Sequence, residues 1–243
     1  MENSTTHSQT TNYKEQRERW AHEETLQLTQ HFHRLNKNTA EFERVSDFIM
    51  NKDGDVLRFE TIKKVIKGLR IYLALDASDK EKFTFFPVLE AMTQPGEFHY
   101  FKLFAAHTRE VNTKTEVVPR LFKDIIGKNW DTIDLNLIDD LFIATKKVPK
   151  EFDRIVRVKY YEVSQDIIEK VINNLPEING ITLYSGIDMN KFGDKTSISF
   201  TPVLGFQHNA AMEDIEGYGL QGIMEFSKGE VLIEYTRPCP PTC

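Results

Sequence analysis

A repeated segment constrains the fold of this chain more than any other feature of the sequence. Gly180–Leu204 reads GITLYSGIDMNKFGDKTSISFTPVL, and the earlier segment Gly68–Leu89 reads GLRIYLALDASDKEKFTFFPVL. In both, a glycine opens an apolar run with tyrosine at its fifth position and aspartate at its ninth, and a polar loop then leads to F-x-P-V-L. With the preceding helix-like residues included, 62–89 and 168–204 share eleven identical residues over twenty-eight positions, with two small insertions in the second copy. We therefore interpret the chain as internally duplicated.

Each copy has the pattern of two strands joined by a polar loop. In the second copy the apolar Ile181 and Leu183 alternate with Thr182 and Tyr184. A period of two in β-branched and aromatic residues is typical of a strand with one buried face. The proline of F-x-P-V-L cannot donate a hydrogen bond to a ladder, which favours a strand end or a sheet edge. One such unit buries too little apolar surface to be stable alone, so we expect the two copies to complete one core.

The expected fold class is α+β, with two similar helix-strand-hairpin units packed together and covered by N-terminal and linker helices. A second N-terminal helix is predicted after Thr39, because Phe42, Val45, Phe48 and Ile49 recur at helical spacing. The expected division of the 243 residues is a disordered arm at 1–12, N-terminal helices at 13–52, the first repeat unit at 53–107, a helical linker at 108–150, and the second repeat unit at 151–243.

Composition and charge exclude some classes of function. Charged residues make up 28% and hydrophobic residues 40% of the chain, which is ordinary for a globular protein. The net charge of −6 argues against a nucleic-acid partner, because binding to phosphates needs clustered cations. The N-terminus lacks an apolar signal region, and no apolar stretch approaches the length of about eighteen residues that a membrane span requires. We therefore expect a soluble, cytoplasmic protein without a membrane partner, and a protein partner stays open.

Several motifs resemble ligand sites, and each has a simpler explanation. Residues 217–222, GYGLQG, match the glycine pattern of dinucleotide-binding loops, but a hairpin pattern follows them in place of the required helix. Residues 49–60 resemble a calcium loop in which Ile49 replaces the first aspartate, and ordinary turn chemistry explains the rest. Cys239 and Cys243 can close a short disulfide or share a metal, but two thiols are too few for a zinc site. The seven histidines lack metal-ligand spacing, so we predict no metal and no cofactor.

The repeat singles out four polar residues, Tyr72, Asp76, Tyr184 and Asp188. In each copy the tyrosine and the aspartate lie four apart along a strand, so their side chains share a face. If a pseudo-two-fold axis relates the copies, the two aspartates can converge on one pocket as an acid–base pair. Alternatively, each aspartate starts a hairpin loop and each tyrosine packs with its hydroxyl satisfied.

The pattern G-[IL]-x-[IL]-Y, a polar loop, P-V-L and a proline-rich ending with cysteine resembles a group of short uncharacterised bacterial proteins, mainly from Bacteroidota. The residues that carry the resemblance are Gly68–Tyr72, Gly180–Tyr184, Pro202–Leu204 and Cys239–Cys243. This chain departs from the group by carrying the unit twice. The resemblance implies the fold unit and adds no activity.

Two functions are consistent with these patterns. The predicted function is a non-catalytic binding or protein-interaction module, with Tyr72, Asp76, Tyr184 and Asp188 as candidate binding residues. The alternative is a small-molecule enzyme that uses Asp76 and Asp188 in a cleft between the two repeat units. The sequence contains no G-x-S-x-G, H-E-x-x-H or phosphate-loop motif that would favour the enzyme.

Overall fold

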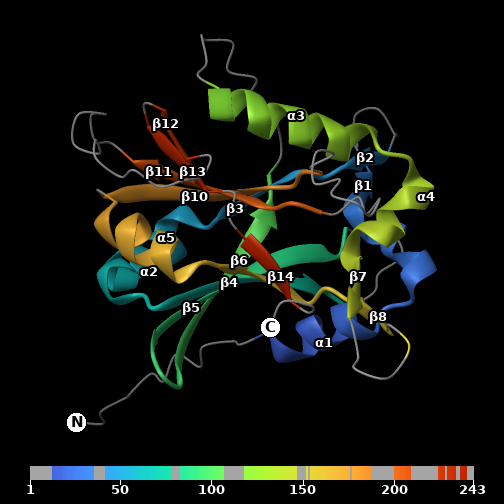
Figure 1. The fold of residues 1–243 in the computed structure, drawn as a ribbon, viewed down its shortest axis with the longest axis horizontal. Coiled ribbons are helices and arrows are strands. Elements are labelled where there is room, and N and C mark those ends of the chain that lie inside the picture. The colour runs from blue at the N-terminus through green and yellow to red at the C-terminus, as the bar shows by residue number, and fades with distance from the viewer. Residues whose placement is uncertain are drawn as a thin grey trace, which may run out of the picture.

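One large antiparallel sheet dominates the computed structural model of this protein (Figure 1). The structure describes residues 13–35, 42–77, 83–106, 118–146, 152, 154–175, 177–187, 200–208, 224–227, 229–233 and 236–239. Within these residues, ten strands follow the order β12-β13-β11-β10-β3-β6-β5-β4-β9-β14. In chain order they span β3 (Asp47–Met50), β4 (Gly68–Leu75), β5 (Phe85–Gln94), β6 (Glu97–Ala105), β9 (Tyr160–Val163), β10 (Ile178–Tyr184), β11 (Val203–His208), β12 (Met224–Ser227), β13 (Glu230–Ile233) and β14 (Thr236–Cys239).

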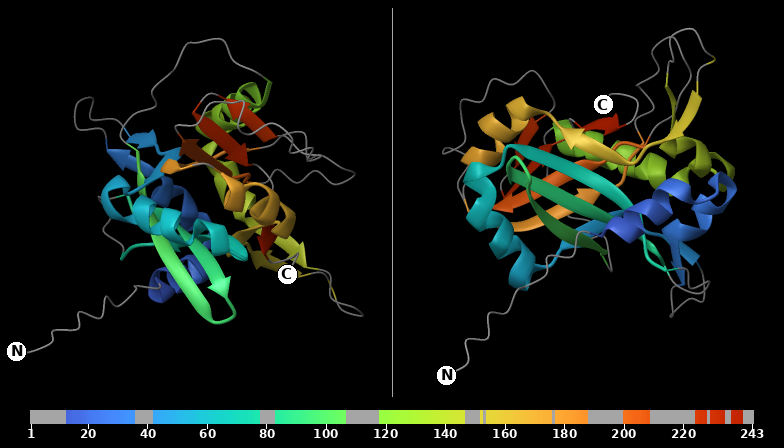
Figure 2. Two further views of the ribbon diagram at one scale, coloured as in Figure 1. Left: turned by 90° about the vertical axis from the view of Figure 1, so that its left-hand side faces the viewer. Right: turned by 90° about the horizontal axis from the view of Figure 1, so that it is seen from below.

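The sheet curls until its ends approach each other (Figure 2). β13 lies next to one edge of the sheet, and β14 forms the opposite edge. Ile233 ends β13 and Thr236 begins β14, so only three residue steps join them. Because an extended chain spans at most about 3.6 Å per residue, these strand ends lie within about 11 Å of each other. The inner face of the curl therefore encloses the core.

Short helices and two small hairpins surround the sheet. The α-helices are α1 (Lys14–His22), α2 (Leu57–Ile62), α3 (Val118–Thr132), α4 (Leu135–Ile138) and α5 (Gln165–Lys170), and 3-10 turns span Thr25–Phe32, Lys63–Val65, Asp139–Phe142 and Ile172–Asn174. The hairpins pair β1 (His33–Leu35) with β2 (Phe42–Arg44) and β7 (Ile143–Lys146) with β8 (Arg154–Arg157). Helix α1 packs on the outer face of β4, and α3 covers β11 and β13 through Ile126. The β7–β8 hairpin stands away from the body (Figure 2).

The α+β fold of two packed helix-strand-hairpin units is therefore a wrong prediction. The molecule is mostly a large curled antiparallel sheet with a few short helices, which is closer to a mainly-β fold. The predicted helix after Thr39 is also wrong, because 42–44 and 47–50 are strands. In Asp47–Met50 the buried Phe48 and Met50 alternate with less buried neighbours, a period of two in a segment too short to distinguish from helical spacing by sequence.

The two repeated segments form β-hairpins in the same register. Tyr72 lies opposite Val88 in the β4–β5 ladder, and Tyr184 lies opposite Val203 in the β10–β11 ladder. These are the residues that the sequence repeat aligns with each other. We call residues 13–106 the first half of the chain and residues 118–239 the second half.

Each half pairs its first strand of the large sheet with the hairpin of the other half. Strand β3 of the first half pairs with β10 of the second, which places Asp47 opposite Tyr184. Strand β9 of the second half pairs with β4 of the first, which places Tyr160 opposite Tyr72. The halves therefore share one continuous sheet, and this exchange is the reason why they do not form two packed units. The two halves are equivalent in the pairing of their strands. A common origin of the two halves stays a prediction.

Aromatic side chains of the two halves also contact each other in the core. Phe32 and Phe142 stack with ring centroids 5.2 Å apart and an interplanar angle of 5°. Each ring contacts the tryptophan of the other half, with Trp130 at 5.3 Å from Phe32 and Trp20 at 5.0 Å from Phe142. All four side chains are fully buried. Aromatic pairs in such edge-to-face and stacked contacts contribute beyond the area they bury, so the halves are held together at this cluster.

Hydrogen bonds from the two indoles reinforce the exchange. Trp20 Nε1 donates to the carbonyl of Val158 at 2.8 Å, and Trp130 Nε1 donates to the carbonyl of Val45 at 3.2 Å. Val45 lies two residues before β3, and Val158 lies two residues before β9. Trp20 therefore holds the chain just before β9 of the second half, and Trp130 holds the chain just before β3 of the first half.

Candidate functional site

A hollow of about 480 Å³ opens on the outer face of the sheet, where β4 and β5 approach β9 and the start of α5. Three charged residues on adjacent strands, Arg70, Glu90 and Glu162, contribute to its lining. Met92 and Val163 add apolar surface. Its size lies within the range of roughly 300–1,000 Å³ that small-molecule sites occupy.

The three charged residues form one row across the sheet. Arg70 alternates with the buried Leu69 and Ile71, so it points to the outer face of β4. The register places Glu90 opposite it on β5 and Glu162 opposite it on β9. Arg70 Nε donates to Glu162 Oε1 at 3.0 Å, and Arg70 Nη1 donates to Glu90 Oε1 at 3.4 Å. Burial alone lowers the pKa of Arg70, but the hydrogen bond to Glu162 and nearby charges raise it overall, so the guanidinium stays charged.

Glu90 is the most buried charge of the hollow. Its side chain is 5% exposed, and Arg17 of α1 lies 3.5 Å from Oε2. A buried carboxylate is costly unless charges and hydrogen bonds offset the loss of water. Burial first, and Glu90 second, raise the pKa of Tyr100 to about 12, so the Tyr100 hydroxyl stays protonated and bonds to Glu90. The carboxylate is thus held between two guanidinium groups and a phenol.

Tyrosine rings fix the two guanidinium groups. The Arg17 guanidinium lies 4.2 Å from the ring centre of Tyr72 and 5.3 Å from that of Tyr100. The Arg70 guanidinium lies 5.1 Å from the ring centre of Tyr160. The rings of Tyr72 and Tyr160 are 4.9 Å apart. Cation–π contacts of this kind restrict the arginine rotamers, so the hollow is organised before any ligand arrives.

The second half lacks these charges at the equivalent positions. There, the row across the sheet consists of Thr182 with Gly205 on one side and Ile49 on the other. The same ladder geometry is therefore built without Arg70, Glu90 or Glu162. The charged row is an addition to the fold and not a requirement of it.

The structure does not bring the two predicted tyrosines together. Tyr72 lies under Arg17 of α1, as described above. Tyr184 lies under Lys123 of α3, whose ammonium is 4.4 Å from the ring centre, and its hydroxyl donates to Glu230 Oε1 at 2.7 Å. Burial, followed by the Glu230 carboxylate, raises the pKa of Tyr184. Different helices cover the two tyrosines, so they serve different surfaces.

Of the two predicted aspartates, only Asp76 lies within the described residues. Its carboxylate accepts a hydrogen bond from Lys102 Nζ at 2.9 Å, and its side chain is about half exposed. It does not line the hollow. Asp188 lies outside the described residues, so an acid–base pair of the two aspartates stays a prediction.

A second polar cluster, which sequence reasoning missed, is buried beside the aromatic core. Thr84 Oγ1 and His31 Nδ1 are 2.6 Å apart, and His31 Nε2 lies 3.4 Å from Glu23 Oε2. Burial lowers the pKa of His31, although Glu23 acts in the opposite direction. His31 is 5% exposed and Thr84 is 4% exposed, so a substrate does not reach this hydroxyl without a rearrangement. Its role here is structural.

The other motifs give no further site. Glu60, the last position of the calcium-like segment, accepts hydrogen bonds from Lys63 Nζ at 2.7 Å and from the Ile178 amide at 3.1 Å. Residues 217–222 and Cys243 lie outside the described residues. Among the residues that the structure does describe, no three His, Cys, Asp or Glu side chains are placed to hold a metal ion. Within the same residues, no helix has the length and apolar character needed to cross a membrane.

The charged row was not predicted, although the sequence carries a weak sign of it. Arg70 and Glu90 are the charged residues within two otherwise apolar strand segments, GLRIYLAL and FFPVLEAM. The pairing of β4 with β9, which brings Glu162 to the row, is not specified locally by either segment. The chain matches no protein-family model, and curated proteins and solved structures give no match either. Function is therefore argued from the site itself.

Proposed function

We propose that this chain is a non-catalytic binding module that recognises a polar ligand in the hollow beside Arg70. The single observation that carries the proposal is the asymmetry of the two halves. The β4–β5 hairpin of the first half has Arg70 and Glu90 in line with Glu162 of β9, where the β10–β11 hairpin of the second half has Thr182 and Gly205 in line with Ile49 of β3. Charges that the fold does not need, placed in a hollow of ligand size, favour recognition.

The chemistry of the lining favours binding over catalysis. Arg70, together with Arg17 of α1, balances the two carboxylates of the row, and tyrosine rings hold both guanidinium groups, which suits a preformed recognition surface. Ser164 supplies a hydroxyl, but the hollow's lining contains no histidine to activate it as a nucleophile. A binding role requires only the arrangement that is present.

A thermal-shift screen with polar metabolites and short peptides tests the proposal. The matched variant is Arg70→Thr with Glu162→Ile, which copies two of the three positions of the uncharged row, Thr182 and Ile49, and keeps Glu90. A ligand at about 100 times its Kd stabilises the protein by about 2.7 kcal/mol, which raises Tm by roughly 5–10 °C in a chain of this size. We expect such a shift for the wild type and its loss in the double variant.

The control is Lys64→Gln, which changes an exposed charge outside the hollow. This variant should respond to the ligand as the wild type does. The proposal is contradicted if no compound class stabilises the wild type. It is equally contradicted if the shift survives in the double variant, because the ligand then binds elsewhere.

A further inference from the structure

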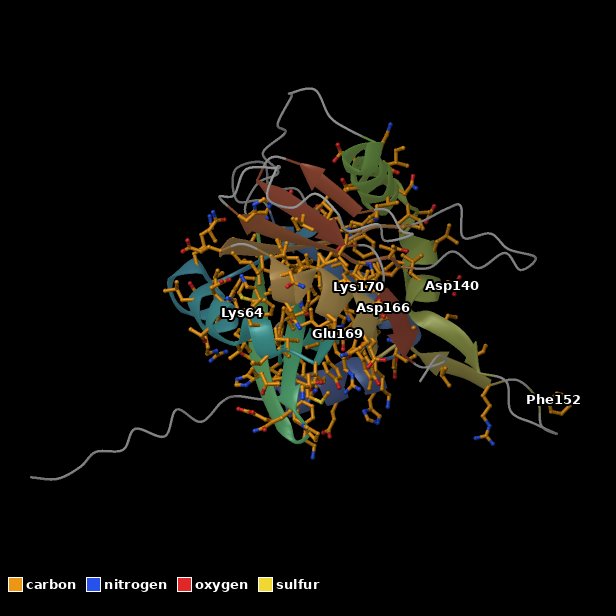
Figure 3. All side chains as sticks on the ribbon, turned by 60° about the vertical axis from the view of Figure 1, so that its left-hand side comes forward. Lys64, Asp140, Phe152, Asp166, Glu169 and Lys170 are labelled. Carbon is orange, nitrogen blue, oxygen red and sulfur yellow. The ribbon has the colours of Figure 1, made fainter. Side chains whose placement is uncertain are left out.

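The unpaired charges of the hollow specify its ligand further, and this step rests on the proposed function. Arg70, Glu90 and Glu162 are engaged with one another. Lys67 and Asp166 also line the hollow, and neither forms an ion pair with another described residue. Asp166 lies on the exposed side of α5 (Figure 3). The hollow therefore presents one uncommitted cation and one uncommitted anion.

A third group of the lining is also uncommitted. Ser164 precedes α5, but its side chain makes no capping hydrogen bond to the helix. A hydroxyl can both donate and accept, so it can serve a peptide carbonyl or an amide. Met92 provides an apolar surface for the rest of a ligand.

We infer that the hollow binds a zwitterionic ligand of the amino-acid or short-peptide class. The ligand carboxylate pairs with Lys67 Nζ, and the ligand ammonium pairs with the Asp166 carboxylate. Ligands of a single charge sign satisfy one of these groups and leave the other unpaired. The charged row does not discriminate between zwitterionic ligands and ligands of a single charge sign, because its charges are already compensated. Specificity for both ends of the ligand therefore comes from Lys67 and Asp166.

The test uses isothermal titration of the full chain with three probes: tri-alanine with free termini, its C-terminal amide, and its N-acetyl form. Free tri-alanine should bind most tightly, and blocking either terminus should weaken binding by roughly 2- to 5-fold, as expected for an exposed ion pair. Lys67→Met should bind the free acid and the amide equally. Asp166→Asn should bind the free and acetylated forms equally.

Neighbouring charges supply matched controls. Lys64→Met and Glu169→Gln remove an exposed lysine three residues before Lys67 and an exposed carboxylate three residues after Asp166 (Figure 3). Neither residue lines the hollow, so both variants should keep the wild-type preference. Single alanine serves as a fourth probe. Equal affinity for alanine and tri-alanine supports a free amino acid as the ligand, and tighter binding of tri-alanine supports a peptide.

Two results would overturn the inference. One is tri-alanine binding that neither blocking group weakens. The other is a complete lack of zwitterion binding in a protein whose screen ligand is still lost in the Arg70→Thr, Glu162→Ile variant. In the second case the binding module stands and its ligand class is different. If no ligand binds the hollow at all, the proposed function fails as well.

Discussion

Strands and tryptophans of each half contact the other half. We therefore predict that a destabilising substitution in one half also lowers the stability of the other half. The perturbation is the replacement of a single tryptophan by phenylalanine, at Trp20 or at Trp130. Each indole is fully buried and donates to a carbonyl of the opposite half. Phenylalanine keeps an aromatic ring in the cluster but removes the donor. The equivalent environments predict similar costs for the two substitutions.

The magnitude follows from two contributions. A buried carbonyl that loses its donor costs about 1–3 kcal/mol. The smaller ring leaves a partly unfilled space in a packed aromatic cluster, which adds about 1 kcal/mol. We therefore expect each variant to lose about 2–4 kcal/mol of unfolding free energy. In a chain of this length that loss lowers Tm by roughly 4–16 °C.

The composition makes the assay direct, because the chain contains only two tryptophans. In Trp20→Phe the remaining indole reports on the second half, and in Trp130→Phe it reports on the first. Urea unfolding should be followed by tryptophan fluorescence and by far-ultraviolet circular dichroism. We expect one transition with coincident midpoints by both probes, shifted to lower urea in both variants.

An unchanged fluorescence midpoint in Trp20→Phe would refute the reasoning, since the second half would then unfold independently of the first. Two separated transitions would refute it in the same way. Phe152→Leu is the matched control. Phe152 is 95% exposed, so this change should alter the unfolding free energy by less than about 0.5 kcal/mol.

Three further predictions concern buried contacts. Lys63→Met should cost about 2–4 kcal/mol in urea unfolding, because Lys63 is 1% exposed and its loss leaves the Glu60 carboxylate without its cation. Burial holds the pKa of His31 below its ordinary value of 6.5, so the fold favours the neutral ring. Stability from this group is complete above pH 6.5 and is lost as the pH falls below it, and His31→Leu should flatten the fall in Tm between pH 7 and 5. Gly186→Ala should cost about 1–3 kcal/mol, since its new methyl group meets the Ile126 side chain of α3, and in a double-mutant cycle with Ile126→Ala the loss for the pair should be smaller than the sum of the two single losses.

The pattern of residues within single segments predicted the strands that those segments form. The alternation around Tyr72 and Tyr184 indicated strands, and both segments are strands in hairpins. The pairing of β3 with β10 and of β9 with β4 was missed because it joins residues that lie 88 to 137 positions apart in the chain. The four residues of β3 gave no periodicity that separates a strand from a helix.

The site was missed for the same reason. Arg70 and Glu90 lie on one predicted hairpin, but Glu162 reaches them only through the exchanged strand. The repeat singles out Tyr72 and Tyr184 because both copies contain them. The charged row lies where the copies differ, so the repeat does not mark it.

Because the two halves belong to one chain, the charged row can form at one hairpin without forming at the other. Two separate, identical chains with the same strand exchange would carry every feature in duplicate, on both sides of a symmetry axis. One continuous chain removes that restriction, because a substitution at Arg70 leaves Thr182 untouched. The proposed binding site can therefore occur once per molecule, beside Arg70, without a copy beside Thr182.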